Sequence, residues 1–277
     1  MLKKFLNGLL NRAETRFSRG RAWRKKLSLI YHTIRLCKNW PYLWRKNFSE
    51  VPSLLRMRNG VVFRVLNPAM TIRILSEVWR DQVYGNLGHL KDVPEPVIID
   101  IGAHVGAFSV FALFTLPRAR VVALEPDKDS FSCLEQNLRE NKLDGRSTAV
   151  NKAIMGSLGN RTFFIRGPNS PDNSFFLPKL PGGGFAEAEI PCITLEDAFN
   201  QFQIDKCDFL KIDCQGGEYE ILLNASDSCL KKIKSIVLEY HTHVPGYGPE
   251  ILMEFLGKNG FQVIKKRHTR TIFAHRM

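Results

Sequence analysis

The chain has 277 residues, of which 44% are hydrophobic and 24% charged, a composition that excludes disordered and membrane-spanning proteins. No run of about 18 uninterrupted apolar residues occurs, so we expect no membrane-spanning helix. The net charge of +13 is confined to the N-terminal part: residues 1–60 hold 15 Lys and Arg against 2 Asp and Glu, and the rest of the chain is neutral.

The six cysteines form no C-x-x-C pair, so we expect free thiols in a reducing compartment. The start of the chain has the positive charge of a signal peptide but lacks a long enough apolar centre. Both features predict a cytoplasmic protein, with a peripheral membrane contact as the alternative that the basic N-terminus leaves open.

Residues 1–59 predict a basic, aromatic-rich helical extension, and the apolar residues among the first ten have helical spacing. Three interpretations stay open for this extension. It packs as a helical cap on the next domain, it lies on an anionic membrane surface, or it contacts a polyanion such as RNA.

Residues 60–277 predict one α/β domain, with residues 60–96 as its N-terminal strand and helix and residues 97–277 as its core. Asn59 and Gly60 form a strong turn signal, and the residues after them alternate like a strand. From residue 97 onward strands and helices alternate, which predicts a mainly parallel sheet covered on both faces. The last two strands, 261–267 and 271–276, predict an antiparallel hairpin.

A glycine loop follows the first strand of this core. Asp100 ends the strand, and Gly102, His104 and Gly106 follow it. In an open parallel sheet the ligand lies beyond the carboxyl ends of the strands. The loop has G-x-x-x-G where a dinucleotide fingerprint needs G-x-G-x-x-G, so it favours a nucleoside without phosphates. The alternative is a purely structural glycine turn.

Glu125 ends the second strand of the core, 19 residues after Gly106. An acidic side chain at this place can accept both hydroxyls of a ribose at once. With the glycine loop before it at this spacing, Glu125 predicts a nucleoside site.

Three further polar residues end the fourth and fifth strands. Asp213 follows a nearly all-apolar strand, where an unpaired charge costs several kcal/mol, so we expect it to have a partner. Glu239 and His241 end the next strand, and His241 could act as a general base near neutral pH or be a satisfied loop histidine. We interpret Glu218 as a negative charge that is favourably placed at a helix N-terminus.

Two histidines, His241 and His243, stand two residues apart and with Asp213 and Glu239 could hold one metal ion. No second cluster supports such a site, so we predict no metal.

Residues 167–184 are rich in proline and glycine and cannot stay regular for long. A loop of this length inside a compact domain is often a lid. We therefore expect it to close over a substrate near Asn173 and Ser174.

In these motifs the sequence resembles the FkbM family of methyltransferases. The run LKIDCQGGEYEIL is the family-specific part, while the glycine loop is shared by the whole methyltransferase class. The matching segments, in the expected order, are DIGAHVGAFSV from 100, ALEPD at 123–127, TLEDAF at 194–199, DFLKIDCQGGEYEIL at 208–222 and VLEYH at 237–241.

The resemblance implies a Rossmann-like class I methyltransferase fold with a mainly parallel seven-stranded sheet. It also implies S-adenosyl-L-methionine as the methyl donor, and most often an oxygen acceptor on a sugar or another small metabolite. By position, Glu125 would hold the ribose, Asn151 would lie near the adenine and Asp213 would face the reacting methyl group. The methionine part would be lined by Asp100, Gly102 and Gly106.

The sequence departs from the family at two positions. His104 stands where the family often has Asn, which changes a hydrogen-bonding partner in the loop, and we expect His104 to contact the cofactor. Gln215 stands where the family usually has Glu, which removes a carboxylate near the reaction centre.

These observations favour O-methylation of a small-molecule or sugar-type acceptor by in-line methyl transfer. Alignment and desolvation supply most of the catalytic gain in such a step. Asp213, Glu239 and His241 are the candidates for positioning the acceptor or removing its proton. The alternatives are an RNA methyltransferase that uses the basic N-terminus, and a non-catalytic relative that uses the fold to bind a partner.

Overall fold

The structure is a computed structural model that describes residues 19–45, 53–167, 170, 173–176, 185–266 and 268–276, without the side chains of 19–26. The predicted amphipathic start and most of the predicted lid lie outside these residues. The chain divides into two compact units, residues 1–80 and 81–277. The strand and helix between residues 60 and 80, which we grouped with the main domain, therefore fall in the first unit.

The described part of the first unit consists of helices and one antiparallel strand pair. Its elements are α2 (Arg19–Leu36), α3 (Trp40–Arg45), β1 (Ser53–Arg56), β2 (Val62–Val65), α4 (Pro68–Leu75) and the π-helix η2 (Ser76–Arg80). The predicted turn at Gly60, whose φ is +97°, lies in the antiparallel connection of β1 to β2. Our expectation of helix up to residue 59 is wrong over β1, because its pairing with β2 determines the local structure.

The second unit is built from alternating strands and helices. Its strands are β3 (Val97–Ile101), β4 (Arg120–Leu124), β5 (Ser147–Val150), β6 (Ala153–Ile154), β7 (Gly159–Ile165), β8 (Ala186–Ile193), β9 (Phe209–Ile212), β10 (Ser235–Glu239), β11 (Gln262–Lys266) and β12 (Thr271–His275). Its helices are η3 (Gly88–Leu90), α5 (Ala107–Thr115), α6 (Lys128–Glu140), η4 (Asp144–Arg146), α7 (Leu195–Gln201), α8 (Glu218–Leu223), α9 (Asp227–Lys231) and α10 (Pro249–Lys258).

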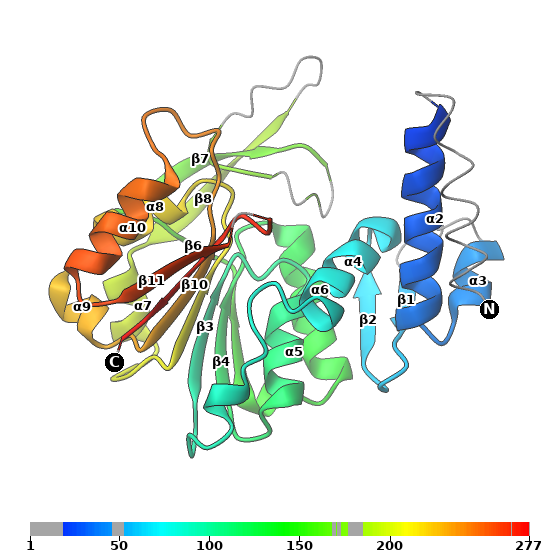
Figure 1. Ribbon diagram of the computed structural model, residues 1–277, viewed down its shortest axis with the longest axis horizontal. Coiled ribbons are helices and arrows are strands. Elements are labelled where there is room, and N and C mark those ends of the chain that lie inside the picture. The colour runs from blue at the N-terminus through cyan, green and yellow to red at the C-terminus, as the bar shows by residue number, and fades with distance from the viewer. Residues whose placement is uncertain are drawn as a thin grey trace. The chain divides into compact units, whose positions relative to one another are not determined.

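Seven strands form the main sheet, in the order β11-β12-β10-β9-β3-β4-β5. The pairs from β5 to β10 are parallel, and β12 is antiparallel to both of its neighbours. Helices α5 and α6 lie on one side of this sheet and α8 and α10 on the other (Figure 1). The arrangement confirms the predicted class I methyltransferase fold and its closing hairpin.

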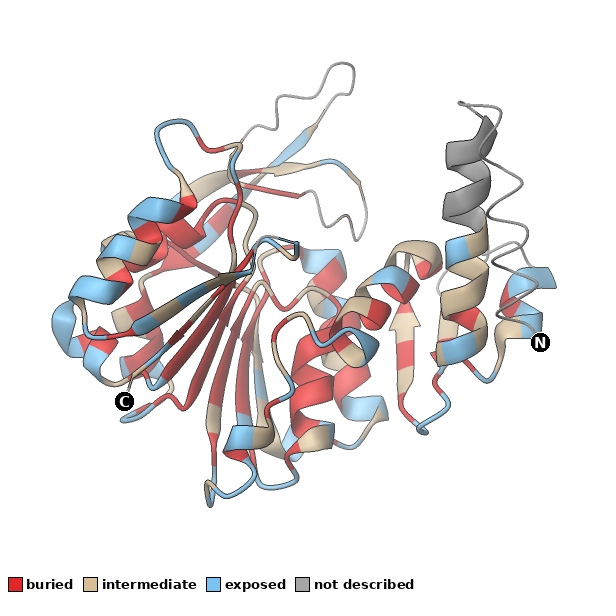
Figure 2. Cartoon of the chain, in the orientation of Figure 1, coloured by how far each residue is buried: buried red, intermediate tan, exposed pale blue. Residues whose placement is uncertain are grey.

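The strand order reverses between β3 and β9, because the chain continues from β3 to β4 on one side and β9 pairs on the other. Such a switch point is where open α/β sheets bind ligands, beyond the carboxyl ends of the strands. The central strands are buried along most of their length (Figure 2). All four residues of β9 are buried, including Lys211.

A separate three-stranded sheet, in the order β6-β8-β7, packs around a small apolar cluster that includes Phe163 and Ile190. We predicted no strand over β8 from the sequence. Pro191 lies inside β8, opposite Asn160 of β7, and a proline in a strand argues against the assignment. None of the described helices combines the length and apolar character needed to cross a membrane.

Candidate active site at the carboxyl ends of the parallel strands

The loops after β3 and β9 touch each other backbone to backbone. Gly102 has a φ of +74°, and a Cβ atom on it would lie 1.8 Å from the carbonyl oxygen of Asp213. The amide of Asp213 donates to the carbonyl of Ile101 over 3.0 Å. Gly102 is therefore required by contact with the chain itself, and it brings the glycine loop against Asp213.

The glycine loop is held tightly by its own surroundings. Gly106 has a φ of +84° and precedes α5, and a Cβ there would meet the Leu134 side chain at 2.7 Å. The buried Asn137 side chain donates to the carbonyl of Val105 over 2.8 Å. His104 has a φ of +53°, a left-handed conformation that few residues adopt without support.

Asp100 faces the interior of the protein. Its side chain is fully buried, accepts a hydrogen bond from the Ser109 hydroxyl at 2.6 Å and forms an ion pair with Lys211 at 2.9 Å. The predicted contact of Asp100 with a cofactor remains a prediction. In this structure its carboxylate neutralises Lys211 beneath the glycine loop.

Glu125 lies beside that loop, as predicted. Its two carboxylate oxygens accept hydrogen bonds from the amides of His104, at 2.7 Å, and Asp127, at 2.9 Å. Burial raises the pKa of Glu125 to about 8, although the two backbone hydrogen bonds lower it. The Asn151 amide donates to the carbonyls of Glu125 and Pro126, so its side chain fixes the turn after β4.

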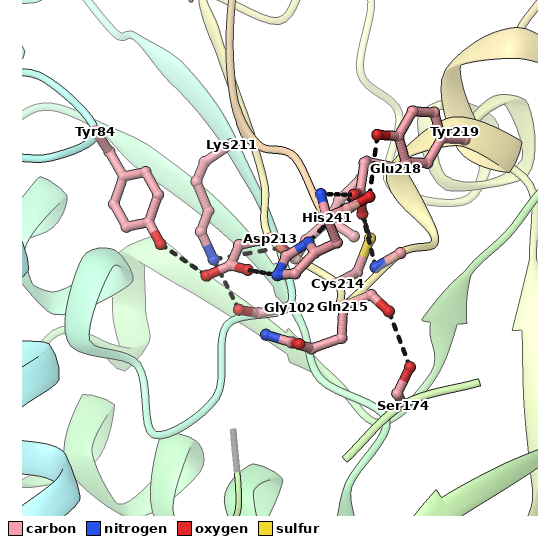
Figure 3. A network of polar contacts seen from close by, with 12 residues as sticks. Tyr84, Gly102, Ser174, Lys211, Asp213, Cys214, Gln215, Glu218, Tyr219 and His241 are labelled. Atoms are coloured by element: carbon pink, nitrogen blue, oxygen red, sulfur yellow. Dashed lines mark hydrogen bonds and ion pairs between the residues drawn. The ribbon is translucent and has the colours of Figure 1, made fainter. Parts of the chain in front are cut away.

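Asp213 is the centre of the polar network shown in Figure 3. Its Oδ2 accepts a hydrogen bond from the Tyr84 hydroxyl at 2.7 Å, and its Oδ1 lies 4.0 Å from Nε2 of His241. Oδ1 is buried and accepts no hydrogen bond from the part of the chain that the structure describes. Burial and the charge of Asp213 raise the pKa of Tyr84 well above its ordinary value.

His241 is held by Glu218. One oxygen of the buried Glu218 carboxylate accepts from the His241 amide at 2.7 Å and lies 3.1 Å from Nδ1 of its ring. Burial alone would lower the pKa of His241, but the hydrogen bond and charge of Glu218, with the charges of Asp213 and Glu239, raise it to about 9. His241 therefore carries a proton at neutral pH, which does not suit the general base that we considered.

Glu218 does more than favour a helix N-terminus. Its second oxygen accepts from the amide of Gly216 at 2.8 Å, and the Tyr219 hydroxyl donates to the carbonyl of His241 at 3.0 Å. These contacts tie the turn after β9 to the end of β10. They bring Asp213 and His241 to one place, as their positions at strand ends predicted.

Glu239 and His243 lie at the edge of this network. Glu239 is half-buried at the end of β10, opposite Thr271, and its charge helps to raise the pKa values of Tyr84 and His241. The ring of His243 lies 5.7 Å from that of His241. Among the described residues, His, Cys, Asp and Glu form no group of three suited to a metal ion.

The two residues predicted for the lid are described and buried. Asn173 accepts from the Arg166 amide at 2.9 Å and donates to the Gly167 carbonyl at 3.2 Å. Ser174 pairs with Phe164, and its hydroxyl donates to the Gln215 carbonyl at 2.8 Å. Both side chains hold the base of the loop, and Ser174 ties it to the turn after Asp213.

Sequence reasoning missed two residues of this site, Tyr84 and Lys211. A lysine inside an otherwise apolar strand could have been noticed, since a buried ammonium needs acceptors. Tyr84 gives no such signal, because it precedes the core strands in an irregular segment and only the fold brings it to Asp213.

The chain is similar in sequence to known methyltransferases. The family model described as the methyltransferase FkbM domain matches residues 100–263. The chain is 26% identical over 249 residues to the 31-O-demethyl-FK506 methyltransferase FkbM of Streptomyces tacrolimicus, covering 79% of this chain and 92% of that protein. It is 25% identical over 225 residues to the methyltransferase sdnD of Sordaria araneosa, covering 70% of this chain and 83% of that protein.

Among solved structures, the chain is similar to TYW2 of M. jannaschii in complex with AdoMet, with a TM-score of 0.41 and 14% identity. That alignment covers 83% of this chain and 88% of the other. The family match spans more than half of the chain and contains both the glycine loop and Asp213. The protein therefore belongs to the FkbM-domain methyltransferases.

Proposed function

We propose that this methyltransferase uses S-adenosyl-L-methionine to methylate a hydroxyl group of a small, sugar-like acceptor. The observation that carries the proposal is the pair formed by Asp213 and His241. A buried carboxylate oxygen that accepts no hydrogen bond from the described residues lies 4.0 Å from an imidazole nitrogen, at the switch point of the sheet.

The chain's own residues fit the cofactor. Both oxygens of Glu125 already accept one backbone amide each, and each keeps a second lone pair for a ribose hydroxyl. The glycine loop that would hold the methionine part is fixed by Gly102, Gly106 and Asn137 before any ligand binds. Bound S-adenosyl-L-methionine would supply an activated methyl carbon for attack in line by the acceptor oxygen.

The charges at Asp213 and His241 favour a hydroxyl as the acceptor. An oxygen placed to one side of the line from Oδ1 to Nε2 can lie within hydrogen-bonding distance, about 2.8 Å, of both atoms. A hydroxyl can donate to the carboxylate and accept from the protonated ring at the same time. An ammonium group cannot accept, and a carboxylate cannot donate.

Asp213 would accept the proton of that hydroxyl. Tyr84 holds the other carboxylate oxygen. The Asp213 side chain as a whole is 22% exposed although Oδ1 itself is buried, so Oδ1 would have to turn toward the acceptor. Protonated His241, oriented by Glu218, would position the acceptor oxygen. Alignment of this kind supplies much of the rate gain when two molecules react.

The test is methyl transfer from S-adenosyl-L-methionine with a tritium-labelled methyl group, using the full chain. Acceptors would be a metabolite extract, a panel of saccharides and bulk RNA, with the products separated by chromatography and treated with acid and base. We expect label in an acid- and base-stable ether of a small molecule. Label in RNA would favour the RNA methyltransferase instead, and label in an ester or amine would exclude the hydroxyl acceptor.

Asp213→Asn separates catalysis from cofactor binding. We expect the variant to bind S-adenosyl-L-methionine by calorimetry about as well as the wild type and to lose at least about 100-fold in transfer rate. Failure of the wild type to bind S-adenosyl-L-methionine would favour the non-catalytic alternative.

A further inference from the structure

We infer that Lys211 is a positioning residue for the cofactor loop and that it sets the affinity of the protein for S-adenosyl-L-methionine. The inference rests on the proposed function, because it concerns the same cofactor. Lys211 stands in β9, directly opposite Asp100 of β3 in the parallel register. Its side chain is 4% exposed.

The ammonium group of Lys211 gathers three acceptors from the neighbouring strand and its loop. Nζ donates to the carbonyl of Gly102 at 2.7 Å and to that of Ile101 at 3.4 Å, and it pairs with Asp100 at 2.9 Å. It also lies 5.3 Å from the centre of the Tyr84 ring. One side chain thus connects β9, the end of β3 and the first residue of the glycine loop.

The group that holds Gly102 stays charged. Burial lowers the pKa of Lys211, but the charges of Asp100 and Asp213 outweigh that effect and raise the pKa above its ordinary value. A charged donor makes a shorter and stronger hydrogen bond than a neutral one. Lys211 therefore fixes the direction of the Gly102 carbonyl firmly.

Lys211 holds a part of the loop, the Gly102 carbonyl, that the other described contacts of the loop do not hold. The amides of Gly102 and Ala103 donate to the carbonyl of Leu124, and the amide of His104 donates to Glu125. Lys211 holds the loop from the side of β9, beneath the place where the cofactor would bind. Without it, the Gly102 carbonyl would lose its charged partner and would have to be oriented at the moment of binding, which lowers affinity.

A structural role for Lys211 must be separated from a role in positioning. Replacing Lys211 alone leaves the buried Asp100 unpaired, which is strongly destabilising. The test therefore starts from Asp100→Asn, in which Lys211 keeps the carbonyls of Ile101 and Gly102 and the nearby charge of Asp213. This variant is compared with the double variant Asp100→Asn, Lys211→Met, in which both charges are gone. A second double variant, Asp100→Asn with Lys211→Leu, also removes the donor and serves the same comparison if the first does not fold.

The measurements are calorimetric dissociation constants for S-adenosyl-L-methionine and for its demethylated product, with thermal melts of each variant. We expect the double variant to melt within a few degrees of Asp100→Asn and to bind both compounds at least about tenfold more weakly, by the same factor. Lys231→Met, which removes an exposed lysine at the end of α9, serves as the control and should change neither constant.

Two results would overturn the inference. Affinity within about twofold of Asp100→Asn would leave Lys211 with a purely structural role. Tighter binding of the positively charged cofactor relative to its uncharged-sulfur product would show that Lys211 acts through charge repulsion instead. If the wild type binds neither compound, the proposed function itself fails, which is a different outcome from either of these.

Discussion

The charge of His241 links this residue to the stability of the fold. Its pKa rises from 6.5 to about 9 in the folded protein, because Glu218 and Asp213 outweigh the effect of burial. A group with a raised pKa stabilises the fold fully below its unfolded pKa, and this contribution is lost as the pH rises through the folded value. The shift corresponds to about 3 kcal/mol at most.

We therefore expect the free energy of unfolding of the wild type to fall between about pH 6.5 and about pH 9, by more than in His241→Gln. Urea unfolding at several pH values across this window would measure the difference between the two proteins. Identical pH dependence in both would contradict the ion pair of His241 with Glu218.

Glu125 predicts a pH dependence for cofactor binding instead. Its pKa of about 8, raised by burial, means that the cofactor-free protein holds a proton on Glu125 at neutral pH. Ribose hydroxyls that donate to the carboxylate would favour its charged form, so binding should release a proton. We expect the affinity for S-adenosyl-L-methionine to strengthen as the pH rises from about 6 to about 8, by up to tenfold per pH unit.

Calorimetry in buffers of different ionisation enthalpy would measure that released proton. Glu125→Gln serves as the comparison: it should bind more weakly and without the pH dependence. A variant that keeps the wild-type slope would place the titrating group elsewhere.

At the level of loops and strands, the contact between the two site loops can be tested through one glycine. Gly102→Ala places a Cβ 1.8 Å from the Asp213 carbonyl, at a φ of +74°, so the backbone must move. We expect a loss of about 2–4 kcal/mol in the free energy of unfolding. Gly145→Ala is the matched control, because no atom of the described residues lies within 4 Å of a Cβ at Gly145, and it should be near neutral or slightly stabilising.

Urea unfolding of the two glycine variants would measure both effects. A Gly102→Ala protein as stable as Gly145→Ala would mean that the loops after β3 and β9 do not pack as described.

The sequence predicted the strand ends well and the contacts between them poorly. Alternating strands and helices place Asp100, Glu125 and Asp213 at one edge of the sheet, because the carboxyl ends of parallel strands meet there. Nothing in the local sequence shows that Lys211 would pair with Asp100 inside the protein. That pairing depends on the parallel register of β3 and β9, which is a property of the fold.

The protonation of His241 could not be predicted from the local sequence either. Its place at a strand end suggested a base, but its proton affinity depends on Glu218, 23 residues earlier in the chain. Pro191 similarly concealed β8, because the local pattern disfavours a proline in a strand, although β8 pairs with β7 at Pro191 and with β6 only from Cys192 onward. Long-range contacts thus decide both the protonation of the site and its smaller sheet.

Across the whole molecule, the excess positive charge and the family match lie in different parts of the chain. The family match lies within residues 100–263, in the second unit. The excess positive charge lies within residues 1–60, in the first unit. A polybasic segment with exposed aromatic residues, among them Tyr42 and Trp44, is typical of proteins that contact an anionic lipid surface.

That separation predicts salt-dependent binding of the full chain to vesicles of phosphatidylcholine with about one third phosphatidylserine, and none to phosphatidylcholine alone. Each basic residue near such a surface contributes about 1 kcal/mol. A triple variant with Gln at Arg35, Lys38 and Arg45 should therefore bind at least about tenfold more weakly in a flotation assay.

The matched control for that triple variant places Gln at Lys231, Lys258 and Lys266, three exposed lysines of the second unit. Both variants lose the same net charge. If vesicle binding depended only on the total charge of the protein, both variants would therefore bind equally weakly. A local contact through residues 1–59 predicts a larger loss for the first variant. Equal losses would remove the membrane interpretation, and binding to RNA but not to vesicles would favour the polyanion contact in its place.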